Sequence, residues 1–328
     1  MHGMSWISVP ISFATAMLLI PITIKKLKER GITAPDRYKI DRRDVPTCGG
    51  TAIITASAIA LIVTALLCDL LFDCRINKYD IAHLLVMIFF GFFGLIDDFY
   101  DIGRTTKIFL PVFLTFPVLS VLDSSSNSSV VLPFLGVLDL GMLIYPVSAV
   151  YVMVVSNLVN MHSGFNGLAS GLSVMLLATL FVKTVMRGQE CLFLGCVLGA
   201  TIAFWWFNRY PARIFLGNVG SLSLGAVTGA VIVANGFFLS GFIMLIPHTV
   251  NFLMYVFWRV MHKINPDDSK WRLTKFGYVM EDGTLYVPNA LTLKWVLPYH
   301  FRMTEVRAVL AMYALSAPFC IASLFVPF

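Results

Sequence analysis

Three carboxylates lie within five residues of one another at the end of an apolar stretch: Asp97, Asp98 and Asp101. On a helix, Asp97 and Asp101 stand four residues apart and therefore share one face. Acidic side chains at a membrane boundary are costly unless they are solvated, paired or bound to a cation. The cluster therefore suits a hard cation such as Mg²⁺, or a general base beside one. The alternative is a set of helix-end charges among lipid headgroups.

A second candidate segment is rich in side-chain amides and contains Asn157, Asn160 and Asn166. Amide oxygens can coordinate Mg²⁺ or contact the edge of a base or sugar, but amides at a span end can equally hydrogen-bond neighbouring helices. The Gly-x-Asn-Gly turn around Asn166 is irregular backbone. Such backbone is tolerated at membrane depth only where it is buried in protein or lines a cavity. This segment therefore indicates a polar site.

Three further polar segments carry most of the positive charge that could bind phosphate. The first, residues 36–50, contains Asp36 and Lys39 and ends in a Gly-Gly pair that permits close backbone approach. The second, residues 211–221, contains Arg213 and Asn218 in a Gly-rich surrounding. The third, residues 261–305, is long and basic, and the alternation at 284–287 predicts a small hairpin. For the first and third segments, the alternative is a basic surface that touches anionic lipid headgroups.

The elements that position these residues are transmembrane helices. Of the 328 residues, 58% are hydrophobic and only 13% are charged, which exceeds the apolar content of soluble domains. Because each span uses roughly 20 residues, the length predicts one helical bundle rather than two soluble domains. Ten apolar stretches are expected to span, at 6–24, 49–72, 81–96, 108–122, 141–159, 167–185, 191–207, 221–235, 237–260 and 306–328.

The distribution of basic residues predicts how this bundle is oriented. In the ten-span arrangement, 20 of the 24 Lys and Arg residues lie on one side, and the other side has only Arg75, Lys78, Lys183 and Arg187. Because Lys and Arg concentrate in cytoplasmic loops, all five polar segments are expected to face the cytoplasm, with both termini outside or lumenal. Of the six cysteines, only Cys68 and Cys74 flank a short polar loop and could pair in an oxidising compartment.

In this order, the segments resemble the polyprenyl-phosphate N-acetylhexosamine-1-phosphate transferase family from about residue 36 to residue 302. The motifs are Asp97-Asp98-x-x-Asp101 with Lys107, Asn157-x-x-Asn160, and Gly164-Phe165-Asn166-Gly167-Leu168. An Asn at 166, rather than an Asp, is similar to the eukaryotic and archaeal branch. That branch transfers GlcNAc-1-phosphate from UDP-GlcNAc to dolichyl phosphate, the first step of N-glycan assembly. The bacterial peptidoglycan branch is a less good match.

The resemblance implies a role for each matched residue. Asn160 and Asn218 would hold Mg²⁺, with Mn²⁺ as an alternative, and Asn166 would contact the uracil. Asp97 or Asp98 would engage or deprotonate the lipid phosphate, and Asp101 completes the catalytic carboxylates. The candidate substrate-binding residues are Asp36, Lys39, Lys107, Asn157, Asn166, Arg213, Lys270, Arg272, His300 and Arg302, among which Lys107 and Lys270 would contact phosphates and Arg272 the N-acetyl group.

Two residues depart from the family pattern. Asn218 stands where the family usually has an Asp, which keeps one oxygen ligand but removes a charge, so Mg²⁺ should bind more weakly. Trp271 stands where a His is frequent, and an indole cannot transfer a proton. The chain is then an active enzyme with altered metal affinity, an inactive paralogue or a deliberately inactivated variant.

We therefore expect an all-α integral membrane protein with about ten transmembrane helices in one domain, 1–328. Its cytoplasmic active site would include the hairpin-containing loop 261–305 between helices 9 and 10. The expected partners are a UDP-N-acetylhexosamine, a polyprenyl or dolichyl phosphate, the membrane and, as a homodimer, a second copy, but no nucleic acid. The host membrane would be an archaeal plasma membrane or the endoplasmic reticulum. The alternatives are a catalytically impaired homologue that acts as a partner or regulator, and a transporter.

Overall fold

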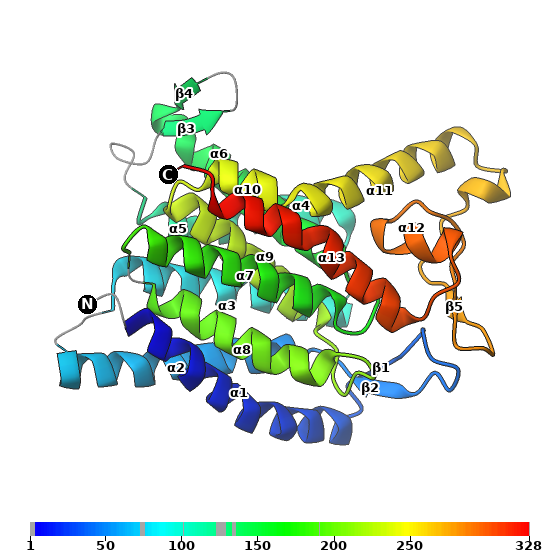
Figure 1. Cartoon of the computed structure of the whole chain (residues 1–328), viewed down its shortest axis with the longest axis horizontal. Coiled ribbons are helices and arrows are strands. Elements are labelled where there is room, and N and C mark those ends of the chain that lie inside the picture. Colours follow the sequence, from blue (N-terminus) through cyan, green and yellow to red (C-terminus); the bar gives the residue numbers. More distant parts are fainter. Residues whose placement is uncertain are drawn as a thin grey trace.

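The computed structural model describes residues 4–72, 76–100, 102–122, 129–132, 136–189 and 191–327. The protein is a helical bundle with short hairpins at its ends (Figure 1). The helices are α1 Met4–Glu29, α2 Gly50–Phe72, α3 Lys78–Tyr100, α4 Arg104–Leu114, α5 Phe116–Leu119, α6 Ile144–Asn160, α7 Leu168–Met186, α8 Leu192–Asn208, α9 Gly217–Ala234, α10 Phe238–Met244, α11 Ile246–Ile264, α12 Leu293–His300 and α13 Glu305–Leu324. Two 3₁₀ turns, Gly141–Leu143 and Ser269–Trp271, complete the helical elements.

Three antiparallel hairpins connect these helices. Strand β1 (Thr33–Pro35) pairs with β2 (Asp44–Pro46), β3 (Ser129–Leu132) with β4 (Gly136–Asp139), and β5 (Tyr278–Val279) with β6 (Leu285–Tyr286). The third hairpin confirms the one predicted from the alternation at 284–287. The first two were not predicted, because strands of three or four residues leave too short a pattern to recognise.

Seven of the described helices are long and apolar enough to cross a membrane, or eight if α10 and α11 form one span. Two of the expected spans are interrupted by proline, which cannot continue a helical hydrogen-bond ladder. The 108–122 stretch divides into α4 and α5, with Pro117 at the start of α5. The 237–260 stretch divides into α10 and α11, which bend by 63° beside Pro247. A count of ten spans stays a prediction, as does the Cys68–Cys74 pair, because Cys74 lies outside the described residues.

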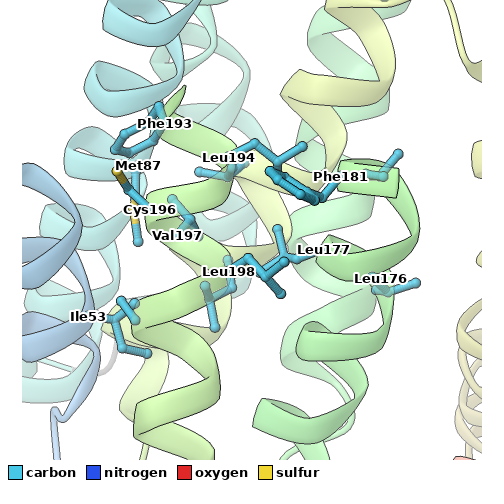
Figure 2. Packing of buried hydrophobic residues seen from close by; sticks show 14 of the residues in the cluster. Ile53, Met87, Leu176, Leu177, Phe181, Phe193, Leu194, Cys196, Val197 and Leu198 are labelled. Atoms are coloured by element: carbon cyan, nitrogen blue, oxygen red, sulfur yellow. The ribbon is translucent and has the colours of Figure 1, made fainter. Parts of the chain in front are cut away.

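Helix α9 forms the centre of the bundle and is buried almost throughout its length. It packs against α3 and α6, while α8 packs against α1 and α2. Small residues let transmembrane helices approach closely, and α9 is rich in Gly, Ala and Ser. Figure 2 shows the neighbouring apolar core, where Phe181 of α7 and Phe193 of α8 are fully buried.

Two glycines fix the position of the α9 N-terminus. A Cβ at Gly50 of α2 would overlap the backbone of Gly220, and a Cβ at Gly94 of α3 would overlap the backbone at Asn218. Both helices therefore contact α9 backbone to backbone. The Gly-Gly pair at 49–50 was predicted to permit close backbone approach, and the backbone that approaches Gly50 is that of α9. This contact places the acidic end of α3 beside the first turn of α9.

The loop between α11 and α13 is attached to the bundle through a second apolar core. Tyr38 is central to it, since its hydroxyl accepts hydrogen bonds from Gly277 N at 3.1 Å and Trp295 Nε1 at 3.2 Å. Apolar residues of α13 such as Met312 pack into the same core. In Figure 1, the hairpin β1–β2, the strand β5 and α12 lie at one end of the bundle, opposite the start of α1 and the end of α13.

Candidate active site

A cavity of about 670 Å³ lies where the loops meet the bundle, and it collects residues from all five polar segments. The candidates predicted from the sequence that line it are Asp36, Asp98, Lys107, Asn160, Asn166 and Asn218. Aromatic side chains such as Phe165, Phe276 and Trp295 also line it. A concave site with convergent polar groups and apolar walls is the usual form of a small-molecule site.

Asp98 faces this cavity from the end of α3 and caps the N-terminus of α9. Its Oδ1 accepts from Asn218 N at 3.0 Å, and its Oδ2 accepts from Val219 N at 3.2 Å and from Cys48 Sγ at 3.6 Å. The first turn of a helix presents unpaired N–H groups that favour a carboxylate. Burial and the neighbouring Asp98 raise the pKa of Cys48 to about 12, so its thiol stays protonated and can donate.

Asp97 forms a separate set of contacts behind the cavity wall. Its Oδ1 lies 2.8 Å from Lys107 Nζ and accepts from Ile102 N at 3.0 Å, while its Oδ2 accepts from Asn218 Nδ2 at 2.8 Å. Asp97 is therefore neutralised by Lys107 and fixes the Asn218 amide. Asp101, the third predicted carboxylate, lies outside the described residues.

The oxygen atoms around the α9 N-terminus fit a weak divalent-cation site. In the described part of the chain, no three His, Cys, Asp or Glu side chains converge as metal ligands. Mg²⁺, however, is commonly held by one or two carboxylates together with waters and substrate phosphates. Asp98, Asn160 and Asn218 all line the cavity, and each carries a side-chain oxygen. Asn160 Oδ1 accepts one hydrogen bond, from Ser221 Oγ at 2.6 Å, which leaves it a second lone pair.

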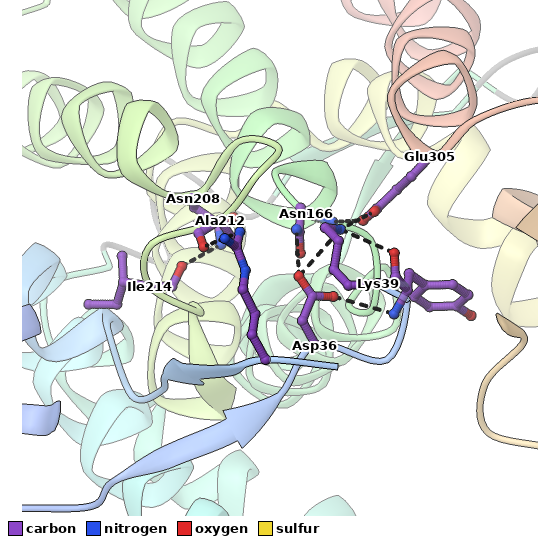
Figure 3. Close-up of polar contacts among 9 residues, drawn as sticks. Asp36, Lys39, Asn166, Asn208, Ala212, Ile214 and Glu305 are labelled. Carbon is purple, nitrogen blue, oxygen red and sulfur yellow. Dashed lines mark hydrogen bonds and ion pairs between the residues drawn. The ribbon is translucent and has the colours of Figure 1, made fainter. Parts of the chain in front are cut away.

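Asn166 is held by two buried carboxylates (Figure 3). Its Nδ2 donates to Asp36 Oδ2 at 2.9 Å, and its backbone N donates to Glu305 Oε1 at 2.6 Å. Lys39 Nζ bridges the two acids, at 3.3 Å from Asp36 and 2.6 Å from Glu305. The network joins the first loop, the turn after α6 and the start of α13. Lys39 therefore forms ion pairs with carboxylates of the protein itself, and Asp36 fixes the orientation of the Asn166 side chain.

Several cavity residues were not found from the sequence. Asn208 lines the cavity, donates to Ile214 O at 2.8 Å and accepts from Ser170 Oγ at 2.7 Å (Figure 3). Arg37, Lys275 and Lys294 supply positive charge to the wall. Nothing in their spacing separates these three cations from other loop cations, so the sequence alone offers no signal for them.

Other candidates lie away from the cavity in this structure. Asn157 donates back to Met153 O at 2.9 Å, and Arg213 lies over the Phe207 ring at 4.4 Å. The candidates of the 261–305 loop that do not line the cavity are exposed: Lys270, Arg272, His300 and Arg302. Their substrate contacts stay predictions.

Comparison with known proteins identifies the family. Residues 81–236 match the family described as "Glycosyl transferase family 4". The chain is 28% identical over 294 residues to the UDP-N-acetylglucosamine–dolichyl-phosphate N-acetylglucosaminephosphotransferase assigned in Sulfolobus acidocaldarius, covering 87% of this chain and 85% of that one. For the protein of the same name in Saccharolobus solfataricus, the identity is 28% over 322 residues, covering 95% and 93%.

A bacterial relative extends the comparison to the peptidoglycan branch. The phospho-N-acetylmuramoyl-pentapeptide-transferase of Wolbachia sp. subsp. Brugia malayi is 30% identical over 239 residues, covering 66% of this chain and 71% of that protein. The matched residues include the acidic end of α3, the Asn160 and Asn166 segment, and the first turn of α9. The chain therefore belongs to glycosyl transferase family 4, the polyprenyl-phosphate N-acetylhexosamine-1-phosphate transferases that its motifs resemble, and is a membrane phosphotransferase.

Proposed function

We propose that the protein transfers GlcNAc-1-phosphate from UDP-GlcNAc to dolichyl phosphate in a Mg²⁺-dependent reaction. One observation carries the proposal: a single cavity gathers Asp98, Asn160, Asn166, Asn218 and Lys107 at the end of a membrane bundle. The names of the two archaeal relatives favour this donor and acceptor. An acceptor phosphate on a lipid requires a site at the headgroup plane, where loops meet helices.

In the proposed reaction, an oxygen of the lipid phosphate forms a bond to the β-phosphorus of UDP-GlcNAc. The bond from that phosphorus to the bridging oxygen of the α-phosphate breaks, and UMP leaves with the electron pair. Because the nucleophile belongs to the substrate, no side chain needs to form a covalent intermediate. Mg²⁺, held by oxygens of Asp98, Asn160 and Asn218, would neutralise charge that develops on the phosphates.

The contacts of Asn166 suit a uracil base. A carboxylate can only accept hydrogen bonds, so Asp36 must receive the amide NH₂ of Asn166. The carbonyl Oδ1 of Asn166 then remains as an acceptor at the cavity wall. Uracil presents an N–H at N3, whereas cytosine presents an acceptor there. We infer that Asp36 sets the preference for uridine donors through Asn166.

The membrane context completes the proposal. The cavity end would face the cytoplasm of an archaeal plasma membrane or of the endoplasmic reticulum membrane, as the Lys and Arg distribution predicts. A homodimer remains part of the proposal, by analogy with related enzymes.

A second candidate function rests on Asn218. Its Nδ2 already donates a hydrogen bond to Asp97 Oδ2 at 2.8 Å, so the proposed metal position is stable without a cation. A catalytically impaired homologue that serves as a partner or regulator of an active transferase would have this property.

The experiment supplies purified protein in detergent with UDP-GlcNAc, with and without dolichyl phosphate, and identifies the nucleotide that is released. The transferase produces UMP only when the lipid phosphate and Mg²⁺ are both present. Release of UDP would indicate transfer of the sugar alone and contradict the proposed reaction. Absence of turnover by folded protein, in the natural sequence and in Asn218→Asp, would favour the partner role.

A further inference from the structure

The side chain of Lys294 enters the cavity from the loop that precedes α13. It lies in the first turn of α12, and its Nζ donates to Ser163 O in the turn after α6. The Nζ also lies 5.6 Å from the centre of the Phe165 ring and 5.9 Å from that of Trp295. The half-buried ammonium is therefore held against one wall of the cavity, between two aromatic rings and a carbonyl.

The position of Lys294 is fixed by its neighbours on both sides. Leu293 N donates to Asn251 Oδ1 of α11 at 2.8 Å, and Trp295 Nε1 donates to the Tyr38 hydroxyl at 3.2 Å. Trp295 is fully buried in the second apolar core. The first turn of α12 is thus attached to the bundle, so the ammonium does not depend on a mobile loop for its position.

Glycine at 164 makes room for this ammonium. A Cβ added at Gly164 would overlap Lys294 Nζ, and the backbone there has a φ of +127°, which L side chains rarely adopt. The Gly-x-Asn-Gly turn, which the sequence indicated as irregular backbone that lines a cavity, therefore admits a lysine from a distant loop.

The charge balance at Lys294 differs from that at two other lysines around the cavity. Lys107 is paired with Asp97, and Lys39 is paired with Asp36 and Glu305. Lys294 makes no ion pair with any carboxylate in the described ranges. A partly desolvated cation without a counter-ion is unfavourable, and an anion bound in the cavity would relieve this cost.

We propose that Lys294 is a donor-binding residue whose ammonium contacts an anionic phosphate oxygen of the nucleotide sugar. The proposal rests on the proposed function and assigns to Lys294 the phosphate contact that the family resemblance implies for Lys270. Lys294 lies beside the Asn166 turn, where the uracil is proposed to bind, so the phosphates attached to that nucleoside are within the same cavity.

The protonation of Lys294 provides an independent readout. Burial lowers the pKa of Lys294 to about 8, so the ammonium is present below that pH and is progressively lost above it. His162 is the neighbouring titratable group, and burial lowers its pKa far below the usual range, which keeps it neutral. The charged groups of the surrounding cavity wall are Asp36, Arg37, Asp98, Lys107 and Lys275. Affinity for a phosphate-bearing ligand should therefore fall as the pH rises through 8.

The experiment measures binding of UDP and of uridine by calorimetry to the full-length protein in detergent. We expect Lys294→Gln to weaken UDP binding about 10- to 100-fold, the range for loss of a charged hydrogen bond, and to leave uridine binding unchanged. Lys294→Arg should retain UDP binding and remove the decline above pH 8. Lys263→Gln, the same change at an exposed lysine in the last turn of α11, should have no effect.

Two outcomes separate this inference from the proposed function. If the natural protein binds UDP and Lys294→Gln binds it equally well, Lys294 is not a donor-binding residue. If the natural protein binds no UDP at any pH, the proposed function itself is wrong. The pH series on the natural protein needs no variant, and a constant UDP affinity from pH 7 to 9 would overturn the inference even if Lys294→Gln failed to fold.

Discussion

The side-chain amide of Asn218 donates to Asp97 at a distance where two carboxylates would repel each other. An aspartate at this position would need a cation between the two acids, whereas the asparagine makes a favourable contact without one. The same exchange removes a negative charge from the candidate Mg²⁺ ligands, which lowers their affinity for the ion. At the residue scale, therefore, the Asn218–Asp97 hydrogen bond stabilises the candidate metal position without needing a cation.

Asn218→Asp should bind Mg²⁺ more tightly and should therefore reach full activity at a lower Mg²⁺ concentration. We expect half-maximal activity at a Mg²⁺ concentration about tenfold lower, which corresponds to ~1.4 kcal/mol. Without Mg²⁺ the variant should melt at a lower temperature than the natural protein, because Asp97 and the new carboxylate repel. Asn265→Asp introduces the same change at the end of α11, outside the cavity, and serves as the control. An unchanged Mg²⁺ titration for Asn218→Asp would show that position 218 does not contact the metal.

Asp36→Asn should weaken discrimination between bases. With an amide at 36, the Asn166 side chain can rotate and present its NH₂ to the cavity, where it can meet the N3 acceptor of cytosine. We expect the preference for UDP over CDP to fall by about 10-fold or more, as for a mismatched buried hydrogen bond. Binding of both nucleotides to Asp36→Asn measures this preference. Asp41→Asn changes an exposed acid of the same loop, and an equal loss there would contradict the role of Asp36.

At the element scale, the packing of glycine-containing helices controls the site. Gly94 of α3 contacts the backbone at Asn218, and Gly50 of α2 contacts Gly220. These contacts hold the first turn of α9 where Asp98 can cap it. The catalytic geometry therefore depends on two positions that bear no functional group.

Gly94→Ala should displace the α9 N-terminus. The added methyl group overlaps the backbone at Asn218, and overpacking of this kind costs about 1–3 kcal/mol. We expect a lower melting temperature. We also expect the fraction of activity that is lost to exceed the fraction of folded protein that is lost. Gly103→Ala is the matched control, because a Cβ there meets nothing within 4 Å. Equal behaviour of the two variants would rule out the proposed contact.

The sequence predicted the helical bundle, because a long apolar stretch in a membrane satisfies its own backbone hydrogen bonds by forming a helix. It also predicted the polar residues at the helix ends that meet in the cavity, such as Asp98, Asn160 and Asn166. It did not predict that 108–122 and 237–260 would break, although Pro117 and Pro247 are visible, because a proline can either kink or end a helix.

The remaining cavity residues depend on contacts between distant segments. Lys294 reaches the site because Trp295 is anchored to Tyr38, more than 250 residues away in the sequence. Glu305 supports the cavity wall without lining it, because the start of α13 lies against the Asn166 turn. Neither contact leaves a periodic pattern or a local spacing, so the sequence could not separate these residues from other loop charges.

At the scale of the whole molecule, the hairpin β1–β2, the strand β5 and α12 lie at one end of the bundle, opposite the start of α1 and the end of α13 (Figure 1). The loops at this end supply cavity-lining residues and many of the Lys and Arg residues. The concentration of Lys and Arg predicts that this end faces the cytoplasm. A cytoplasmic donor and a lipid acceptor could then reach the cavity from different directions, the first through water and the second within the membrane.

Single cysteines should report this orientation. Asp282→Cys, in the exposed turn between β5 and β6, should react with a membrane-impermeant maleimide only from the cytoplasmic side. Met142→Cys, exposed near the start of α6, should react only from the opposite side. The five described native cysteines are buried, which limits background labelling. Labelling of Asp282→Cys from the outside would reverse the orientation.

The proposed reaction moves the sugar to the lipid together with its β-phosphate. The most direct measurement supplies UDP-GlcNAc labelled with ³²P at the β-phosphate, together with dolichyl phosphate and Mg²⁺, and follows the label. We expect the label to appear in the lipid fraction and unlabelled UMP to accumulate in equal amount. Label that remains in UDP while the sugar moves to the lipid would contradict the proposed reaction.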